Sequence, residues 1–99
     1  MARFSVYPNS GGDGYLLDVQ TDIMRHLNTR VVVPLMPLGR APKAATSLNP
    51  LFVIDAIEHT MVTQYLAAVP TSALQHKTLD LADRRDDIVN AIDLLLQGS

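Results

Sequence analysis

Three histidines are the first side chains of this sequence that could move protons or hold a metal ion. His26, His59 and His76 lie in separate segments, and their separations do not match the spacing of metal ligands. The chain contains no cysteine, which excludes thiolate ligands, thiol nucleophiles and disulfide bonds. It also contains no P-loop, no dinucleotide-binding glycine motif and no nucleophile elbow. We therefore predict no catalytic residue, no metal site and no cofactor.

Carboxylates near the C-terminus form a second group that could support acid–base chemistry. They open a segment with helical periodicity and lie beside Arg84 and Arg85: Asp80, Asp83, Asp86 and Asp87. Asp80 or Asp83 can accept N–H bonds at a helix start, where carboxylates also stabilise the positive end of the helix dipole. Helix capping and ion pairing therefore account for this group better than catalysis does.

Two further carboxylates, Asp18 and Asp22, lie in the sequence LLDVQTD, directly after an apolar run that predicts a strand. A carboxylate that is partly buried there needs a cationic partner such as Arg30, because burying an unpaired charge costs several kcal/mol. We interpret this group as a buried ion pair or a subunit contact.

The overall composition limits the possible functions further. Eight basic and ten acidic residues give a net charge of −2, and five residues are aromatic. Direct nucleic-acid binding needs clustered Lys and Arg side chains and exposed aromatic rings, so we predict no such contact. The N-terminal sequence lacks the apolar core of a signal peptide, and no apolar run reaches the ~20 residues of a membrane span. We expect a cytoplasmic protein without membrane contact that forms a single domain over residues 1–99.

The elements that would position these side chains are mostly short strands. Apolar patterns separated by Gly and Pro predict five to seven strands, in the ranges 3–8, 15–20, 29–35, 51–57, 60–66 and 68–74. Pro34 has no backbone N–H, and we expect it to end the third strand or to lie at an edge. Residues 34–50 carry four prolines and are interpreted as a long connection with room for one short strand around 35–38. A hairpin is expected to turn at Glu58 and His59.

The last part of the chain changes from strand to helix periodicity. Apolar residues recur at helical spacing along residues 81–96: Leu81, Ile88, Ala91, Ile92 and Leu95. Gly98 suits the left-handed residue that commonly ends a helix. Val89, Leu94 and Leu96 lie off the apolar stripe, which predicts a second apolar surface that another copy of the chain or another protein covers.

Four stretches together resemble the CcdB toxins of bacterial toxin–antitoxin modules. They are LLDVQTDI (16–23), TRVVVPL (29–35), MVTQYLAAVP (61–70) and DIVNAIDLLLQGS (87–99). Their order, their spacing and the total length agree with that family. The resemblance implies a mainly β fold, namely the SH3-like barrel of antiparallel strands that CcdB and MazF toxins share, with a C-terminal α-helix.

The resemblance also implies a function and partners. CcdB toxins are homodimers that are not enzymes. They bind the gyrase A subunit and trap the cleaved gyrase–DNA complex, which blocks replication. A CcdA-like antitoxin neutralises them through a disordered arm, and modules of this kind serve plasmid maintenance.

The family's binding residues can be carried over onto matching positions of this chain. The gyrase-binding surface falls on the patch after the DVQ strand and on the helix end: Ile23, Met24, Asp93, Leu96, Gln97, Gly98 and Ser99. Ile92 and Leu95 are expected nearer the dimer contact. The best-known toxin ends in Trp-Gly-Ile, of which Gln97-Gly98-Ser99 keeps only the glycine, and Asp93 stands where that toxin has an amide.

Two other functions stay open. Toxins similar to MazF and Kid use the same barrel to cleave RNA, and Arg25, His26 and Arg30 are then the best candidates for contacting a scissile phosphate, although the acidic pI counts against this function. The other alternative is a degenerate homologue that folds, dimerises and binds an antitoxin but no longer poisons gyrase. The Gln97-Gly98-Ser99 end suggests this alternative, because it lacks the tryptophan and isoleucine of the best-known toxin.

Overall fold

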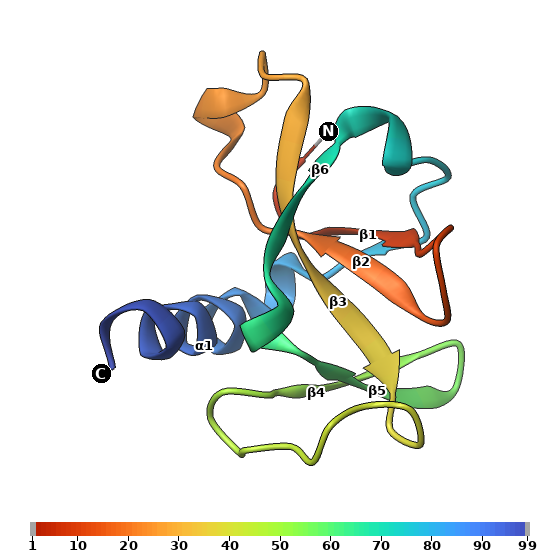
Figure 1. The fold of residues 1–99 in the computed structure, drawn as a ribbon, viewed down its shortest axis with the longest axis vertical. Helices are drawn as coiled ribbons and strands as arrows, with labels where there is room; N and C mark the ends of the chain where they lie inside the picture. The colour runs from red at the N-terminus through yellow and green to blue at the C-terminus, as the bar shows by residue number, and fades with distance from the viewer. Residues whose placement is uncertain (1, 99) are drawn as a thin grey trace.

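The computed structural model describes residues 2–98, and within this range seven antiparallel strands form one curled sheet that is followed by a C-terminal helix (Figure 1). The strands are β1 (Ser5–Pro8), β2 (Tyr15–Asp18), β3 (Thr29–Pro37), β4 (Leu51–Ile54), β5 (Ile57–Met61), β6 (Ala67–Pro70) and β7 (Leu79–Asp80). The helix is α1 (Arg85–Gln97), and four short 3-10 turns are η1 (Asp22–Met24), η2 (Thr63–Tyr65), η3 (Thr71–Ala73) and η4 (Ala82–Arg84). The predicted mainly β fold with a C-terminal helix is confirmed.

Strand β3 organises the sheet because it pairs with three other strands. One of its edges pairs with β2, while the other pairs first with β6 and then with β5. The expectation that Pro34 ends this strand is wrong, since β3 continues to Pro37. Pro34 lies where the partner changes from β6 to β5, and its carbonyl accepts a hydrogen bond from the Val62 N–H at 3.0 Å. A proline fits there because no partner carbonyl needs its missing N–H.

The hairpin after the long connection turns earlier than predicted. Strands β4 and β5 join through Asp55 and Ala56, whose φ angles are +54° and +63°, so Glu58 and His59 belong to β5. Two successive positive φ angles match the twist of a tight hairpin, but Asn-Gly or Asp-Gly is the usual sequence for such a turn. Asp-Ala lacks that signature, which explains why the pattern misplaced the turn.

The end of the sheet also differs from the pattern. The strand expected over 68–74 is β6, which ends at Pro70 and passes into η3. The two-residue strand β7 was not predicted, because Leu79 and Asp80 are too few to show a period. Strand β7 pairs with β1 at the sheet edge and brings the chain to the start of the helix.

The core lies between the concave side of the sheet and the helix. It contains residues from both ends of the chain: Phe4, Val6, Leu17, Val19, Val33, Leu35, Phe52, Ile54, Met61, Leu81, Ile88 and Ala91. Helix α1 begins at Arg85 rather than at the predicted residue 81, because the 3-10 turn η4 occupies residues 82–84. The first N–H of η4, that of Ala82, donates to Asp80 Oδ1 at 2.7 Å. Gly98 has φ +73° and donates to the Leu94 carbonyl, which confirms the predicted left-handed cap.

The length and composition of the helices bear on whether the chain could cross a membrane. Among residues 2–98, no helix is long and apolar enough to cross a membrane.

Candidate functional site

The end of helix α1 carries most of the predicted binding residues in an exposed position. Leu96 is 68% exposed, Asp93, Gln97 and Gly98 are also exposed, and Ser99 lies outside the described residues. In Figure 1 the helix projects away from the sheet and ends at the label C. Its first turns are held by the buried Ile88 and Ala91, so the last turn presents its apolar side chains to the surroundings.

The other predicted binding residues lie in the turn η1. Ile23 is 79% exposed and Met24 is 44% exposed, and η1 contains no buried residue. The whole run 21–29 is exposed on the surface. In Figure 1, η1 and the end of α1 both project to the left of the sheet, η1 above and α1 below.

Strand β6 runs between these two segments, a link that no motif in the sequence indicates. The turn η2 before β6 packs against α1, and Thr71 after β6 donates its backbone N–H to the Asn28 carbonyl at 3.0 Å. Tyr65, Ala67 and Ala68 are exposed along this path. The uncharged run QYLAAVP was the available signal, because a surface strand without charge is unusual. We call the exposed residues of η1, β6 and the end of α1 together the helix-end surface.

The two residues expected near the dimer contact differ in their burial. Ile92 is half-buried and packs against the core, whereas Leu95 is 36% exposed. Leu94 is more buried than Leu95, but the helix residues that pack against the core beside Ile88 and Ala91 are Val89 and Ile92. Leu95 is thus available for a contact outside the chain, and its role in a dimer stays a prediction.

A buried ion pair lies at the base of the η1 segment. Arg30 Nε donates to Asp18 Oδ2 at 2.8 Å and Arg30 Nη2 donates to Asp18 Oδ1 at 3.0 Å, with both side chains at most 1% exposed. Burial raises the pKa of the Asp18 carboxyl, while the hydrogen bond and the charge of Arg30 act in the opposite direction. The predicted buried pair is confirmed. Asp22 is exposed, and its Oδ1 lies 3.6 Å from Arg30 Nη2.

This pairing changes the interpretation of the basic residues proposed for RNA cleavage. Arg25 and His26 are exposed in the η1 segment, but Arg30 is buried and its guanidinium is directed at Asp18 and the Gln20 carbonyl. Because the Arg30 side chain is only 1% exposed, it offers almost no surface to a phosphate. The structure therefore does not bring the three residues together as a catalytic group.

The histidines are equally separate in space. His26 and His76 are exposed, whereas His59 is buried, with Nδ1 2.9 Å from the Ile57 carbonyl and its ring edge-on to Tyr15. Among the residues that the structure describes, no group of three His, Asp or Glu side chains could hold a metal ion.

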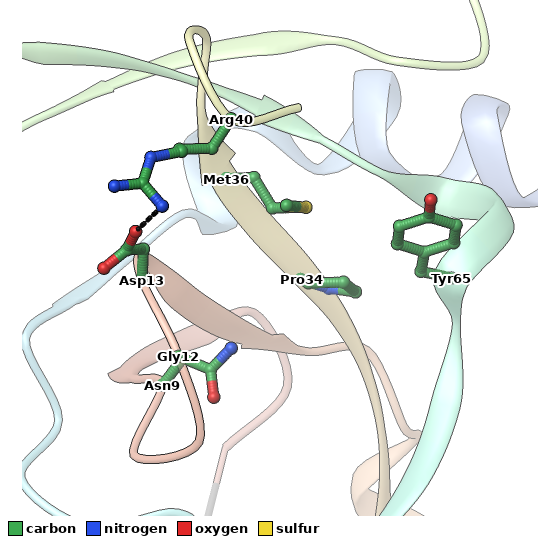
Figure 2. Close-up of a pocket in the computed structure, with 7 residues that line it drawn as sticks. All are labelled: Asn9, Gly12, Asp13, Pro34, Met36, Arg40 and Tyr65. Carbon is green, nitrogen blue, oxygen red and sulfur yellow. Dashed lines mark ion pairs between the residues drawn. The ribbon is translucent and has the colours of Figure 1, made fainter. Parts of the chain in front are cut away.

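A pocket of about 400 Å³ lies between the β1–β2 loop and β3 (Figure 2). Its lining comes from four parts of the chain: Asn9, Gly12, Asp13, Pro34, Met36, Arg40 and Tyr65. Arg40 Nη1 pairs with Asp13 Oδ2 at 3.0 Å, and Figure 2 shows this pair on one side of β3 and Tyr65 on the other. Gly14 lets the loop approach β3, because a Cβ there would overlap the Leu35 carbonyl. No motif in the sequence marks this pocket, since its residues meet only through the strand pairing.

Comparison with protein-family models identifies the family of this chain. The family model described as CcdB protein matches residues 3–98. The chain belongs to the CcdB family. The resemblance drawn from four short stretches is thereby confirmed over nearly the whole sequence. As a CcdB-family chain, the protein falls in the toxin class of toxin–antitoxin modules.

Three solved structures share the fold of this CcdB-family chain. An endoribonuclease in complex with its cognate antitoxin, from mycobacterial species, aligns with a TM-score of 0.79 at 15% identity, covering 97% of this chain and 94% of that one. A second mycobacterial endoribonuclease gives 0.77 at 14% identity, with 97% and 90% covered. The Mycobacterium tuberculosis toxin MazF-mt6 gives 0.72 at 13% identity, with 92% and 93% covered. These likenesses confirm the barrel that CcdB and MazF toxins share.

The same structures correct one prediction for this CcdB-family chain. From the family resemblance we predicted a protein that is not an enzyme. That prediction is contradicted, because two of the three structures with this fold are named endoribonucleases. Neither the barrel nor the lack of familiar catalytic motifs in a small sequence excludes catalysis.

Proposed function

We propose that this protein is a toxin that binds the gyrase A subunit and traps the cleaved gyrase–DNA complex. The observation that carries the proposal is the exposed apolar helix-end surface in a member of the CcdB family. Ile23 and Leu96 rank among the most exposed large apolar side chains of the described chain, at 79% and 68%. Large apolar side chains that are this exposed suit a surface that a partner covers.

The proposed complex is symmetric. A homodimer with contacts through Ile92 and Leu95 would place two copies of the helix end beside one twofold axis. A twofold surface suits a twofold target, because each half makes the same contacts with one gyrase A subunit. Met24, Asp93, Gln97, Gly98 and Ser99 complete this proposed gyrase surface around Ile23 and Leu96.

The C-terminal residues set the expected strength of gyrase binding. Gln97 can donate and accept hydrogen bonds, but it cannot stack on a cation as a tryptophan does. Loss of such a stack costs about 1–2 kcal/mol, which is roughly a tenfold weaker complex. We therefore propose weaker trapping than by a toxin that ends in Trp-Gly-Ile.

A CcdA-like antitoxin is the second proposed partner. One of the structures with the same fold is in complex with its cognate antitoxin, which supports this partner. We propose that a disordered antitoxin arm covers part of the helix-end surface. Such an arm can bury apolar side chains along an extended path, since it orders only on binding.

A gyrase cleavage assay tests the proposal. Purified protein is incubated with gyrase from the same organism, supercoiled DNA and ATP, and the complexes are denatured with detergent and protease. We expect linear DNA to accumulate with increasing protein. An excess of folded protein that yields no linear DNA would overturn the gyrase proposal, and normal growth on expression without antitoxin would point to a degenerate homologue.

A second candidate function is RNA cleavage in the pocket of Figure 2. The fold shared with endoribonucleases and the pairing of Arg40 with Asp13 beside Tyr65 favour it. In such a reaction Asp13 accepts the proton of a 2′-hydroxyl, whose oxygen attacks the phosphorus. The bond to the 5′-oxygen breaks, that oxygen takes up a proton from water, and Arg40 stabilises the added negative charge. The Tyr65 ring could stack on a base.

Total RNA incubated with the purified protein tests this candidate. Discrete fragments are expected if the pocket cleaves RNA, and Arg40→Ala is expected to lower the rate about 100-fold, as removal of a charge-stabilising donor does. Lys43→Ala is the matched control, because Lys43 is also exposed but does not line the pocket. Intact RNA, or equal rates for Arg40→Ala and the unchanged protein, contradicts the candidate.

A further inference from the structure

The exposed tip at Ile23 and Met24 has little packing to hold its shape. The turn η1 contains no buried residue, and its internal order comes from backbone hydrogen bonds between residues close in sequence. Met24 donates to the Thr21 carbonyl at 3.1 Å, and Leu27 donates to the Met24 carbonyl at 3.1 Å. An isolated 3-10 turn of this length is marginal in water, so its conformation must be fixed from outside.

Gln20 provides such an external attachment through its side chain. Its Oε1 accepts a hydrogen bond of 3.1 Å from the backbone N–H of Val31, a residue of β3. Its Nε2 donates to the carbonyl of Met24 at 3.2 Å. One amide side chain therefore joins the central strand of the sheet to the exposed tip.

The backbone of Gln20 is attached to the buried ion pair. Its N–H donates to Asp18 Oδ1 at 3.1 Å, and its carbonyl accepts from Arg30 Nη2 at 3.2 Å. Both ends of the residue are thus fixed by charged groups that are at most 1% exposed. Hydrogen bonds to charged groups are stronger than neutral ones, so the base of this attachment is rigid.

We propose that Gln20 is a positioning residue that holds Ile23 and Met24 in the orientation in which the toxin binds its target. The part that concerns binding rests on the proposed gyrase function. The bond from Nε2 to the Met24 carbonyl links β3 and the ion pair to the end of η1. The start of η1 has a separate attachment, because the Arg3 N–H donates to Asp22 Oδ1 at 2.9 Å.

The variant Gln20→Glu isolates this bond. Glutamate keeps the shape of the side chain and an oxygen that can accept from the Val31 N–H, but it has no donor for the Met24 carbonyl. Gln75→Glu is the matched control, because Gln75 Nε2 donates to the Ser72 carbonyl at 3.0 Å in another surface turn. Thermal unfolding verifies that both variants fold, and a midpoint within about 4 °C of the unchanged protein is expected for the loss of one exposed bond.

Amide hydrogen exchange gives a readout that does not involve gyrase. In Gln20→Glu we expect the amides of Met24 and Leu27 to exchange about tenfold faster, because their turn opens more often once its attachment is lost. The amides of β3 should keep their rates, as should the tip in Gln75→Glu. Unchanged exchange at Met24 and Leu27 in a folded Gln20→Glu protein would overturn the proposal.

Gyrase trapping gives the second readout. Gln20→Glu should raise the protein concentration for half-maximal cleavage about tenfold and leave the maximal extent unchanged, since a disordered tip binds more weakly but still binds. In an Ile23→Ala background, Gln20→Glu should raise this concentration little further, because the side chain that Gln20 positions is already gone. If Gln20→Glu instead disturbed the whole structure, its effect would be as large in this background as in the unchanged protein. If the unchanged protein traps no gyrase, the gyrase function fails, and the exchange rates alone decide whether Gln20 positions the tip.

Discussion

Replacing Arg30 by methionine is expected to lower the free energy of unfolding by about 3–5 kcal/mol, the usual cost of removing one partner of a buried ion pair. The substitution keeps most of the side-chain volume but leaves the Asp18 carboxylate in a site with no exposure to water. Burial raises the pKa of that carboxyl even with Arg30 beside it, so the site disfavours the charged form and Arg30 acts against that effect. Urea unfolding followed by circular dichroism measures the loss.

The double variant Asp18→Val with Arg30→Met separates the ion pair from packing. Two apolar side chains of similar total volume need no counter-charge, so the double variant should regain most of the stability that Arg30→Met loses. A double variant as unstable as the single one would show that the methionine damages packing instead. A loss below about 1 kcal/mol for Arg30→Met would mean that the carboxylate finds water or another partner.

Replacing Leu96 by glutamate is expected to weaken the trapping of cleaved gyrase–DNA complexes about 100-fold, equivalent to about 2.7 kcal/mol. The new carboxylate would enter an apolar contact and would have to lose its water there without a partner. Because Leu96 is 68% exposed at the end of α1, the substitution should change the folding stability little. The protein concentration that gives half-maximal linear DNA measures the effect.

Val53→Glu is the matched control for this experiment. Val53 is 67% exposed, almost the same as Leu96, but it lies on β4 and outside the helix-end surface. The same change in size and charge should therefore leave gyrase trapping close to that of the unchanged protein. Equal weakening by both variants would indicate that net charge, and not the helix-end surface, governs the interaction.

The sequence by itself determined the features that depend on neighbours along the chain. The helical spacing around Ile88 and Ala91 predicted α1, and Gly98 predicted its left-handed end, because both patterns repeat or finish within one or two turns. The pairing of Asp18 with Arg30 was also predictable. A carboxylate after an apolar strand needs a counter-charge, and the next strand offered one.

Only the tertiary structure decided where strands continue and turn. Pro34 breaks a strand on local grounds, yet β3 runs through it because its partner changes from β6 to β5 at that residue. The turn at Asp55 and Ala56 adopts positive φ angles against local preference, since pairing of β4 with β5 holds it there. Long-range pairing outweighed the local signal in both cases, and a propensity pattern contains no term for it.

The candidate sites show the same division. Ile23 and Leu96 were predicted as surface residues from a family resemblance, but the strand β6 that links their segments became evident only in three dimensions. Arg40, Asp13 and Tyr65 form no motif, because the folding of β3 brings them to one pocket from three separate loops or turns. Arg30 was a candidate for surface chemistry until its burial against Asp18 removed it. Residue type is a property of the sequence, but access to a ligand depends on which segments the sheet places together.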